Sequence, residues 1–454
     1  YQEIKGSLEG LLTGKVISCV KHPNADRLKL TTVDIGEESL LQIVCGAPNV
    51  ESGQHVIVAT IGTILHPLNS DEFKINKSKI RGELSQGMIC AEDEIGIGES
   101  HEGIIVLDKK YKPGTKVSKI IENYKDFIFN IGLTPNRSDA MSHHGVARDI
   151  RAALIHKGLK SELLTPSVSS FHINSRTQKV NVKVSSQELC PRFSGICIEN
   201  IKIDNSPKWL QDRLKAIGLT PINNVVDITN YVLHEVGQPL HAYDLKKIKS
   251  KTIEVKTLKE GSTFITLDGV ERKLKNTDLM ICDKNTPMCI AGVYGGDYYG
   301  VSKETKSIFL ESACFNPVSI RKTAKAHSIN SDASFRFERG INIELIKYAL
   351  KRAAILICEI CNGKICSDLI DEYPKKIENM SILLNYEKTN NLIGQKIPSE
   401  EIKSILTSLD FKINNITETG VGITVPNYRH DVTRECDVVE EILRIYGFNE
   451  INLS

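Results

Sequence analysis

The sequence predicts a multidomain α+β fold, and three observations lead to this prediction. The chain has 454 residues, which is enough for roughly two to four domains of about 100–200 residues each. Short strand-like segments separated by turns fill its first part, strands and helices alternate in its middle, and helices dominate its end. Contents of 41% hydrophobic and 25% charged residues are those of an ordinary globular protein.

The apolar runs, the net charge and the cysteine content also limit the possible classes of protein. No apolar run approaches the roughly 18–20 residues needed to span a bilayer. The net charge of +2 leaves any nucleic-acid contact to local basic patches. The 12 cysteines lack a framework spacing, which is typical of reduced thiols, and we therefore expect a cytoplasmic protein. Cys358, Cys361 and Cys366 are either zinc ligands without a fourth partner or, as we favour, buried helix thiols.

Residues 8–124 are predicted to form a small closed β-barrel, because strands follow one another closely without a long helix between them. The strand-like segments are Gly14–Val20, Leu28–Ile35, Leu40–Val44 and His55–Ala59. Basic residues gather at two turns of this region, and such a barrel edge can follow a nucleic-acid backbone. These residues are Lys21, Arg27, Lys77, Lys79 and Arg81. Ordinary solvating charge remains the alternative.

Residues 125–185 are predicted to be a connector. A helix capped by Ser138 or Asp139 is expected to run to about Ile155. Its expected apolar stripe consists of Val146, Ile150, Ala153 and Leu154. The stretch 163–179 is rich in Ser, Thr, Pro and Gln and is expected to be a linker or to cross the surface.

The stretch Thr220–Leu245 is predicted to be an amphipathic helix followed by a stiff loop. Its apolar residues recur three or four positions apart and form one buried face; they are Val225, Ile228, Val232 and Val236. Gly237 and Pro239 are expected to stop the helix and to place His241 in a rigid loop. Either a pocket wall or an ordinary solvated helix fits this pattern.

Glu311 stands out in the middle region, residues 186–372, because it ends the apolar run Ile308–Leu310. An enclosed carboxylate needs a partner and is a candidate functional group. A salt bridge with Arg336 or Arg339 is the competing interpretation. The glycine-rich segment 291–297 allows close backbone approach to a ligand, although an ordinary turn fits equally well.

Residues 373–454 are predicted to form a small domain of helices and a hairpin. In its last helix three acidic residues lie at i, i+3 and i+4 and share one face, with a fourth just before. These residues are Asp431, Asp437, Glu440 and Glu441. Oxygen ligands at this density suit Mg²⁺, whereas stabilisation of the helix dipole is the simpler alternative.

Several motifs resemble a known family. His22–Leu28, Val44–Asn49 and Lys79–Cys90 are similar to the oligonucleotide-binding-fold tRNA-binding domain of aminoacyl-tRNA synthetases. Further motifs resemble the bacterial phenylalanyl-tRNA synthetase β subunit, over its N-terminal and central portion; they are Asn223–Val232, Gly237–Asp244, Ala291–Gly296 and Ser331–Gly340. Thr220 departs from the family pattern, in which Arg is common, so a cationic contact to the tRNA end is missing here.

The resemblance implies a role for each region. Residues 186–372 would be an α/β editing domain that hydrolyses tyrosine wrongly esterified to tRNA(Phe), and residues 373–454 a winged-helix-like domain. In the editing domain, Thr229, His241 and Glu311 would be catalytic, while Gly292 and Ala333 would contact the substrate. The four carboxylates near the end of the chain would hold Mg²⁺ together with the α subunit.

The resemblance also implies partners. The parent enzyme, a heterotetramer of two α and two β subunits, ligates phenylalanine to tRNA(Phe) with ATP, and synthesis takes place in the α subunit. The chain starts at Tyr1 without Met and is expected to be an excised piece. A non-catalytic tRNA-binding scaffold is the alternative, and it predicts tRNA binding without deacylation.

Overall fold

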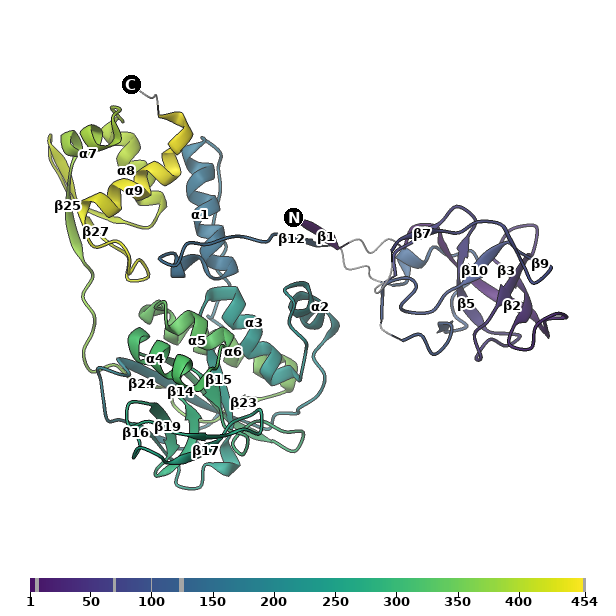
Figure 1. Cartoon of the computed structure of the whole chain (residues 1–454), viewed down its shortest axis with the longest axis horizontal. Coiled ribbons are helices and arrows are strands. Elements are labelled where there is room, and N and C mark those ends of the chain that lie inside the picture. Colours follow the sequence, from purple (N-terminus) through teal and green to yellow (C-terminus); the bar gives the residue numbers. More distant parts are fainter. Residues whose placement is uncertain (5–7, 68–70, 99, 122–125, 452–454) are drawn as a thin grey trace. The chain divides into compact units, whose positions relative to one another are not determined.

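The computed structural model describes residues 1–4, 8–67, 71–98, 100–121 and 126–451. It divides into two compact units, Tyr1–Ile131 and Gly132–Ser454 (Figure 1). The predicted boundary between residues 124 and 125 lies outside the described residues, and the finer division into four domains stays a prediction. Among the described residues, no helix combines the length and the apolar character needed to cross a membrane.

The first unit is built on an antiparallel sheet with the strand order β10-β5-β2-β3-β4, and β11 pairs with β5. Its strands are β2 (Leu11–Lys21), β3 (Lys29–Asp34), β4 (Leu41–Cys45), β5 (His55–Thr60), β10 (Gly87–Ile89) and β11 (Val106–Leu107). The amide of Gln86, just before β10, donates to the carbonyl of Gln42 on β4 over 2.8 Å. The predicted strands are therefore confirmed, and the two ends of the sheet approach each other. The closed oligonucleotide-binding barrel stays a prediction.

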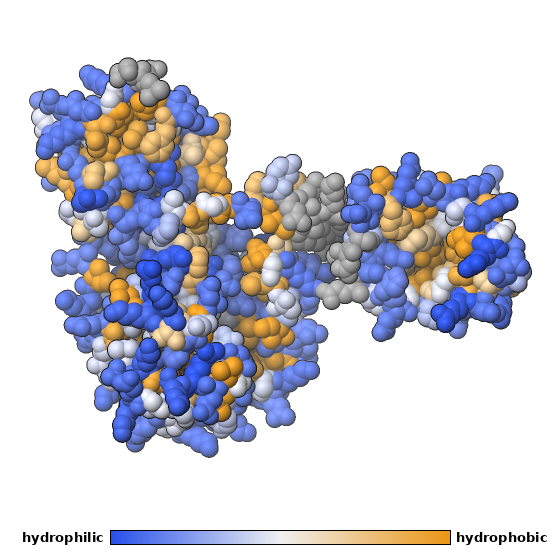
Figure 2. All heavy atoms as spheres, in the orientation of Figure 1, coloured by the Kyte–Doolittle hydropathy of each residue, from blue (hydrophilic) through white to orange (hydrophobic). Residues whose placement is uncertain are grey.

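Smaller elements complete this unit. Three two-stranded ladders pair β1 with β12, β6 with β7 and β8 with β9. The elements are β1 (Gln2–Ile4), β6 (Ile64–Leu65), β7 (Phe73–Lys74), β8 (Ser78–Ile80), β9 (Glu83–Ser85), η1 (Val117–Lys119) and β12 (Asp126–Ile128). Hydrophilic residues make up most of the face of each unit that is visible in Figure 2, and apolar residues appear in smaller groups.

Two sheets form the centre of the second unit. One has the order β15-β22-β14-β23, with β24 also on β14, and the other has the order β13-β16-β19-β20-β21. Their strands are β13 (Asn181–Val184), β14 (Arg192–Glu199), β15 (Leu240–Asp244), β16 (Thr252–Thr257), β19 (Leu279–Asp283), β20 (Thr286–Ile290), β21 (Tyr294–Gly295), β22 (Ser307–Cys314), β23 (Lys364–Ile365) and β24 (Ile370–Glu372). A hairpin, β17 (Thr263–Ile265) and β18 (Glu271–Lys273), adds to them.

Helices cover one face of the β15-β22-β14-β23 sheet, and the other face packs on the second sheet (Figure 1). The helices of this region are α2 (Lys208–Ala216), α3 (Asn224–Val236), α4 (Pro317–His327), α5 (Asp332–Phe337) and α6 (Ile346–Cys361), with short turns η3 (Leu245–Lys247) and η4 (Ile343–Leu345). Because side chains of a strand alternate between faces, each strand of the shared sheet contributes to two apolar cores. One core lies under α3 and α6, and the other lies between the sheets.

The predicted apolar face of α3 is confirmed. Val225, Ile228, Val232 and Val236 are all buried in the core shared with α6. Gly237 ends the helix at a φ of +87°, a conformation that favours glycine. The predicted loop after the helix is wrong, since residues 240–244 form strand β15.

The end of the chain packs a three-stranded sheet, in the order β25-β27-β26, against helices. Its elements are β25 (Ser381–Asn385), α7 (Tyr386–Ile393), α8 (Ser399–Ser408), β26 (Lys412–Ile416), β27 (Gly420–Thr424), α9 (Glu435–Tyr446) and η5 (Phe448–Glu450). The predicted hairpin and helices are confirmed here. The winged-helix description stays a prediction.

Helix α1 (His143–His156) follows the short turn η2 (Ser138–Ala140) and packs against this last region (Figure 1). Its cap is Ser142, whose hydroxyl accepts from the amide of Gly145, so the predicted caps are wrong. The predicted stripe is wrong too: Ile150 is 53% exposed, while Arg148 and Ala152 are buried. The buried side of α1 combines Ala152, in the apolar core of the last region, with Arg148, which pairs with Asp410, so the sequence does not show it as an apolar stripe.

Candidate functional site

The first candidate site lies on neighbouring strands of the sheet that both cores share. His241 on β15 pairs directly opposite Glu311 on β22, and the next pair on the same face is Tyr243 with Phe309. Tyr243 and Phe309 belong to the core between the two sheets. His241 and Glu311 therefore also face the second sheet, since residues two apart on a strand share a face.

Glu311 is enclosed, as the sequence predicts. It is only 5% exposed, and its Oε2 atom accepts a hydrogen bond of 2.7 Å from the hydroxyl of Tyr243. Burial disfavours the charged form and raises the pKa of Glu311 to about 7, although the hydrogen bond from Tyr243 acts in the opposite direction. At neutral pH this carboxyl group can therefore either accept or donate a proton.

The competing interpretation of Glu311 as half of a salt bridge is wrong. Arg336 pairs instead with Asp332, and Arg339 pairs with Glu338. The guanidinium of Arg336 also donates to Nδ1 of His234. The partner of Glu311 is thus a neutral phenol and not a cation.

The imidazole of His241 forms the next part of this site. Its ring meets the ring of Tyr243 edge to face, with 4.5 Å between the centroids. A Cβ atom on Gly295 of strand β21 would lie 2.9 Å from Cε1 of His241, so this position has no room for a side chain. Desolvation lowers the pKa of His241 to about 4, and the ring is neutral at pH 7. A neutral imidazole can accept a proton at one nitrogen and donate at the other.

Gly292 and Ala333 lie on the same side of the shared sheet as Glu311. Gly292 has a φ of +65°, and a Cβ atom there would come within 2.8 Å of Phe315 and 2.9 Å of Phe337. The hydroxyl of Ser331, which caps α5, donates to the carbonyl of Val293 over 2.7 Å. This contact ties the glycine-rich segment to the helix that carries Ala333, which packs on the core between the sheets.

Thr229 lies on a helix that packs on the other face of the shared sheet. It lies on α3, on the same helix face as Val225 and Val232, and that face packs on the opposite side of the shared sheet. Its hydroxyl donates to the carbonyl of Val226 within the helix, over 2.7 Å. The expectation that Thr229 and His241 together face Glu311 stays a prediction.

Two residues of this group escaped sequence reasoning. Tyr243 lies in the motif Gly237–Asp244, but nothing in the sequence pattern shows that it contacts Glu311. Cys289 on β20 lies across from both residues, and burial together with the nearby Glu311 carboxyl raises the pKa of its thiol. The alternation of β15 alone could have suggested Tyr243, because Tyr243 lies two positions after His241.

A second candidate site is the basic surface of the first unit, defined by Lys21, Arg27, Lys77, Lys79 and Arg81. All five of these residues are exposed. The turn after β2 is joined to the β8–β9 hairpin by two side chains: Nε2 of His22 lies 3.1 Å from the carbonyl of Ile80, and Asn24 donates to that of Arg81 over 3.3 Å. The two basic turns of the sequence thus lie side by side.

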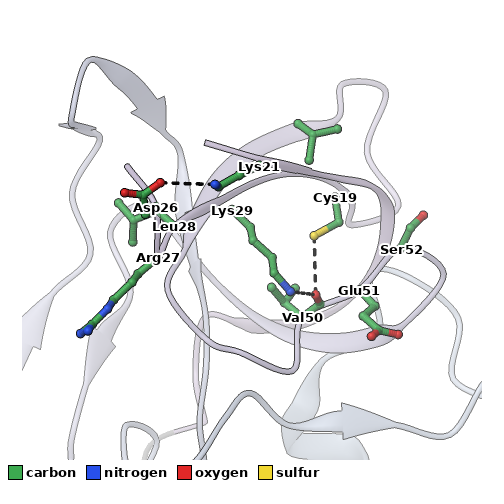
Figure 3. A pocket seen from close by; sticks show the side chains of 10 residues that line it. Cys19, Lys21, Asp26, Arg27, Leu28, Lys29, Val50, Glu51 and Ser52 are labelled. Carbon is green, nitrogen blue, oxygen red and sulfur yellow. Dashed lines mark hydrogen bonds and ion pairs between the residues drawn. The ribbon is translucent and has the colours of Figure 1, made fainter. Parts of the chain in front are cut away.

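A pocket of about 410 Å³ opens beside the first of these turns (Figure 3). Apolar parts of Val20, Leu28 and Val50 line it together with charged residues. Lys29 donates into the loop carbonyls of Pro48 and Val50, so its ammonium group is engaged within the protein. Arg27 points away from the pocket in Figure 3.

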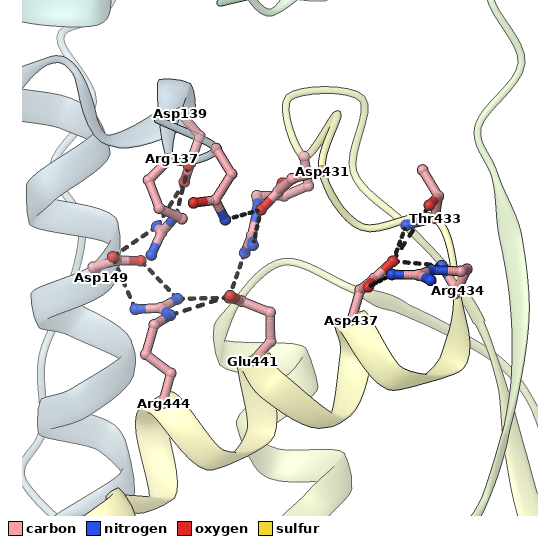
Figure 4. Close-up of polar contacts among 11 residues, drawn as sticks. Arg137, Asp139, Asp149, Asp431, Thr433, Arg434, Asp437, Glu441 and Arg444 are labelled. Carbon is pink, nitrogen blue, oxygen red and sulfur yellow. Dashed lines mark hydrogen bonds and ion pairs between the residues drawn. The ribbon is translucent and has the colours of Figure 1, made fainter. Parts of the chain in front are cut away.

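Three of the four carboxylates predicted to bind Mg²⁺, those of Asp431, Asp437 and Glu441, accept hydrogen bonds from other groups (Figure 4). Glu441, which is 2% exposed, accepts from Arg429 and from Arg444. Burial opposes ionisation of Glu441, but the hydrogen bonds from both arginines outweigh it and lower its pKa to about 2. Asp431 accepts from Arg429 and, over 3.0 Å, from Asn136.

The other two carboxylates point to different surroundings. Asp437 accepts from the amides of Thr433 and Arg434 and from the Arg434 side chain, and so caps α9. Glu440 is exposed. Across the described part of the chain, no three His, Cys, Asp or Glu side chains are grouped so that they could hold a metal ion. As placed here, the four carboxylates do not fit a metal site.

Comparisons with known families now define the class of protein. Residues 11–116 match the tRNA-binding domain family, residues 189–362 match the B3/4 domain, and residues 382–448 match the tRNA synthetase B5 domain. Glu311, His241, Gly292 and Ala333 all lie within the B3/4 match, and the basic surface lies within the tRNA-binding match. The chain thus carries three domain matches, of which two are to families named for tRNA binding or for tRNA synthetases.

Its relatives narrow the class to one family. The chain is homologous over its full length to phenylalanine–tRNA ligase beta subunits, with 52% identity to that of Bacteroides fragilis and 50% to that of Porphyromonas gingivalis, each over 100% of this chain. It covers 55% of the length of each of these relatives. The resemblance predicted from the sequence is confirmed.

A solved structure is also similar. An N-terminal fragment of the phenylalanyl-tRNA synthetase beta subunit from Pyrococcus horikoshii matches 69% of this chain and 85% of its own. The sequence identity is 18% and the TM-score is 0.35, so nothing further rests on this likeness.

Proposed function

We propose that this chain supplies tRNA binding and editing to a phenylalanine–tRNA ligase, as part of a β subunit. The observation that carries the proposal is the buried carboxyl of Glu311, which lies opposite His241 and accepts a hydrogen bond from the neutral hydroxyl of Tyr243. Buried carboxyl groups with shifted pKa values are typical of functional sites. The homologous relatives and the B3/4 match support the same conclusion.

The proposed reaction removes tyrosine from wrongly charged tRNA(Phe). The oxygen of a water molecule adds to the ester carbonyl, and the bond between that carbon and the ribose oxygen breaks. The products are free tyrosine and intact tRNA. A second site is useful because a synthetic pocket rejects an added hydroxyl only weakly.

Glu311 supplies the selectivity in this proposal. The phenolic hydroxyl of tyrosine gives the buried carboxyl a hydrogen-bond donor, whereas phenylalanine has none. Leaving a buried acceptor unpaired costs about 1–3 kcal/mol, or about 5- to 150-fold in the rate of editing. Ala333 leaves room for the aromatic ring, and the backbone of Gly292 approaches the substrate.

His241 and Thr229 take different places in this proposal. The neutral imidazole of His241 can orient the attacking water or the terminal ribose. Thr229, whose hydroxyl donates to the carbonyl of Val226 within α3, contributes to the site through that helix. The basic surface of the first unit binds the tRNA backbone.

The remaining parts of the proposal concern the whole enzyme. An α subunit would be the partner and would ligate phenylalanine to tRNA(Phe) with ATP and Mg²⁺, in a cytoplasmic assembly of two α and two β chains. The division into domains at residues 8–124, 125–185, 186–372 and 373–454 is part of this proposal.

Deacylation of Tyr-tRNA(Phe) tests the proposal. We expect the full chain to release tyrosine faster than phenylalanine, and Glu311→Ala to lose most of that preference. Glu338→Ala is the control, because Glu338 pairs with Arg339 and not with the site. Equal activity of the wild type and Glu311→Ala would contradict the proposal.

A non-catalytic tRNA-binding scaffold is the second candidate, and the continuous basic surface favours it. It predicts salt-sensitive tRNA binding without release of tyrosine. A triple Lys77→Ala, Lys79→Ala and Arg81→Ala variant would weaken binding under both candidates. Only the deacylation measurement separates them.

A further inference from the structure

The carboxyl of Glu311 has two oxygens, and the structure shows what holds one of them. Oε2 accepts from the hydroxyl of Tyr243 at 2.7 Å. That bond directs Oε2 toward β15 and leaves Oε1 outside the contact. A carboxylate that is held by one oxygen can present the other in a fixed direction.

Tyr243 is itself held rigidly. It is completely buried, and its ring meets the His241 ring edge to face at a centroid distance of 4.5 Å. Phe309, paired opposite Tyr243, is also completely buried in the same core. The phenol therefore has little freedom to turn away from Glu311.

We infer that Tyr243 is a positioning residue of the editing site, whose hydroxyl fixes the Glu311 carboxyl so that its other oxygen receives the hydroxyl of a tyrosyl substrate. This inference rests on the proposed function. Tyr243 itself does not touch the substrate. It acts by setting the direction of the Glu311 carboxyl and by stabilising its charged form.

The second effect gives the site a pH dependence. Burial raises the pKa of Glu311 to about 7, and the hydrogen bond from Tyr243 opposes that rise. Hydrogen bonds to an ionised carboxylate are roughly twice as strong as those to a neutral one. The preference for tyrosine over phenylalanine should therefore increase as the pH rises through about 7.

Few other groups near Glu311 can titrate in this range. His241 and Tyr243 face it from β15, Cys289 from β20, and Cys190 from the segment before β14. His241 has a pKa of about 4, and burial raises the pKa values of both thiols and of the phenol. A transition near pH 7 in the preference for tyrosine thus reports on Glu311.

The Tyr243→Phe variant tests the inference through a pH profile. Deacylation of Tyr-tRNA(Phe) and Phe-tRNA(Phe) is measured between pH 6 and 9 for the full chain and for the variant. Without the hydroxyl, we expect the midpoint to move upward by about one pH unit, so that tyrosine release at pH 7 falls about fivefold and recovers at higher pH. Release of phenylalanine should change little.

The outcomes separate the two claims. If the wild type releases no tyrosine, the proposed function fails. If the wild type edits and the two pH profiles coincide, the function stands and the positioning role of Tyr243 is wrong. A uniform loss at every pH, without a shift of the midpoint, also overturns the inference, because it indicates only structural damage.

A second change keeps the test decisive if Tyr243→Phe does not fold. A fluorinated tyrosine placed at position 243 keeps the shape of the ring and is a stronger hydrogen-bond donor. It should move the midpoint to lower pH, and an unchanged midpoint contradicts the inference. Glu311→Gln removes the titrating group, so its profile should lack the transition near pH 7.

Discussion

Two buried glutamates in the second unit have pKa values shifted in opposite directions. Glu311 is 5% exposed and Glu441 is 2% exposed, so burial alone disfavours ionisation of both. Glu311 receives one hydrogen bond from a neutral phenol, and its pKa rises to about 7. Glu441 receives hydrogen bonds from Arg429 and Arg444, and its pKa falls to about 2. The partners, and not the depth of burial, decide whether a buried carboxyl is a reactive group or a structural one.

The largest expected effect is a loss of stability when the ion pairs of Glu441 with Arg429 and Arg444 are broken. Glu441→Ala leaves the buried guanidinium of Arg429 with only Asp431 as a partner, and removing one member of a buried pair costs about 3–5 kcal/mol. Chemical denaturation would measure the loss. Glu440→Ala, one residue away and exposed, should change the stability by less than about 0.5 kcal/mol. Similar losses from the two variants would contradict the structural role of Glu441.

The next effect is that the contributions of Glu311 and Glu441 to folding stability change with pH in opposite directions. The folded pKa of Glu311 lies above the unfolded value of about 4.3, so the folded state holds this proton longer and loses stability as the pH rises toward 7. Relative to Glu311→Gln, the wild type should lose up to about 3 kcal/mol between pH 4.5 and 7. Glu441 has a lowered pKa, so its contribution is present above about pH 4.3 and is lost as the pH falls toward 2. Unfolding curves measured across this range give the free energy of unfolding of both proteins. If Glu311 were ionised throughout, the difference between the wild type and Glu311→Gln would not change with pH.

A smaller effect extends the comparison from buried to exposed charges. Lys77, Lys79 and Arg81 are exposed, and removing any one should weaken tRNA binding mainly at low salt. Each lost phosphate contact reduces the slope of log affinity against log salt by about 0.7–0.9. Titrations at several salt concentrations measure this slope. Lys259→Ala, an exposed lysine of the second unit, should leave it unchanged.

The smallest effect is expected for a change at Thr229. This change tests whether the site is formed only by residues on the side of the shared sheet that carries Glu311. Thr229→Ala removes a hydroxyl that bonds only within its own helix turn, so deacylation should fall less than about threefold, or about 0.6 kcal/mol. His241→Ala should have the larger effect. If Thr229→Ala and His241→Ala reduce deacylation equally, residues on both faces of the shared sheet contribute to the site.

Local patterns in the sequence predicted much of the fold. The apolar spacing of Val225, Ile228, Val232 and Val236 identified the buried face of α3, and Gly237 identified its end. The strands and helices after residue 380 were also predicted, since each carries its own turn and cap signals. These features depend on neighbours within a few positions, which a sequence displays directly.

Features that depend on distant partners could not be predicted in the same way. Periodicity shows that β15 and α3 each have a buried face, but not that these faces place His241 and Thr229 on opposite sides of one sheet. The acidic spacing in α9 suggested ligands, but Arg429 lies 12 positions from Glu441 and could not be recognised as its partner. The contact between Tyr243 and Glu311 joins residues 68 positions apart.

The packing of α1 has a consequence for dividing this chain into fragments. Ala152 lies in the apolar core of the last region, and Asp149 accepts from both Arg137 and Arg444. Helix α1 therefore packs against residues that follow it in the sequence by more than 200 positions. A protease that cuts the irregular stretch 163–179 should leave α1 attached to the C-terminal fragment without a covalent link. A clone that begins at residue 373 would lack this helix and expose its contact surface to aggregation.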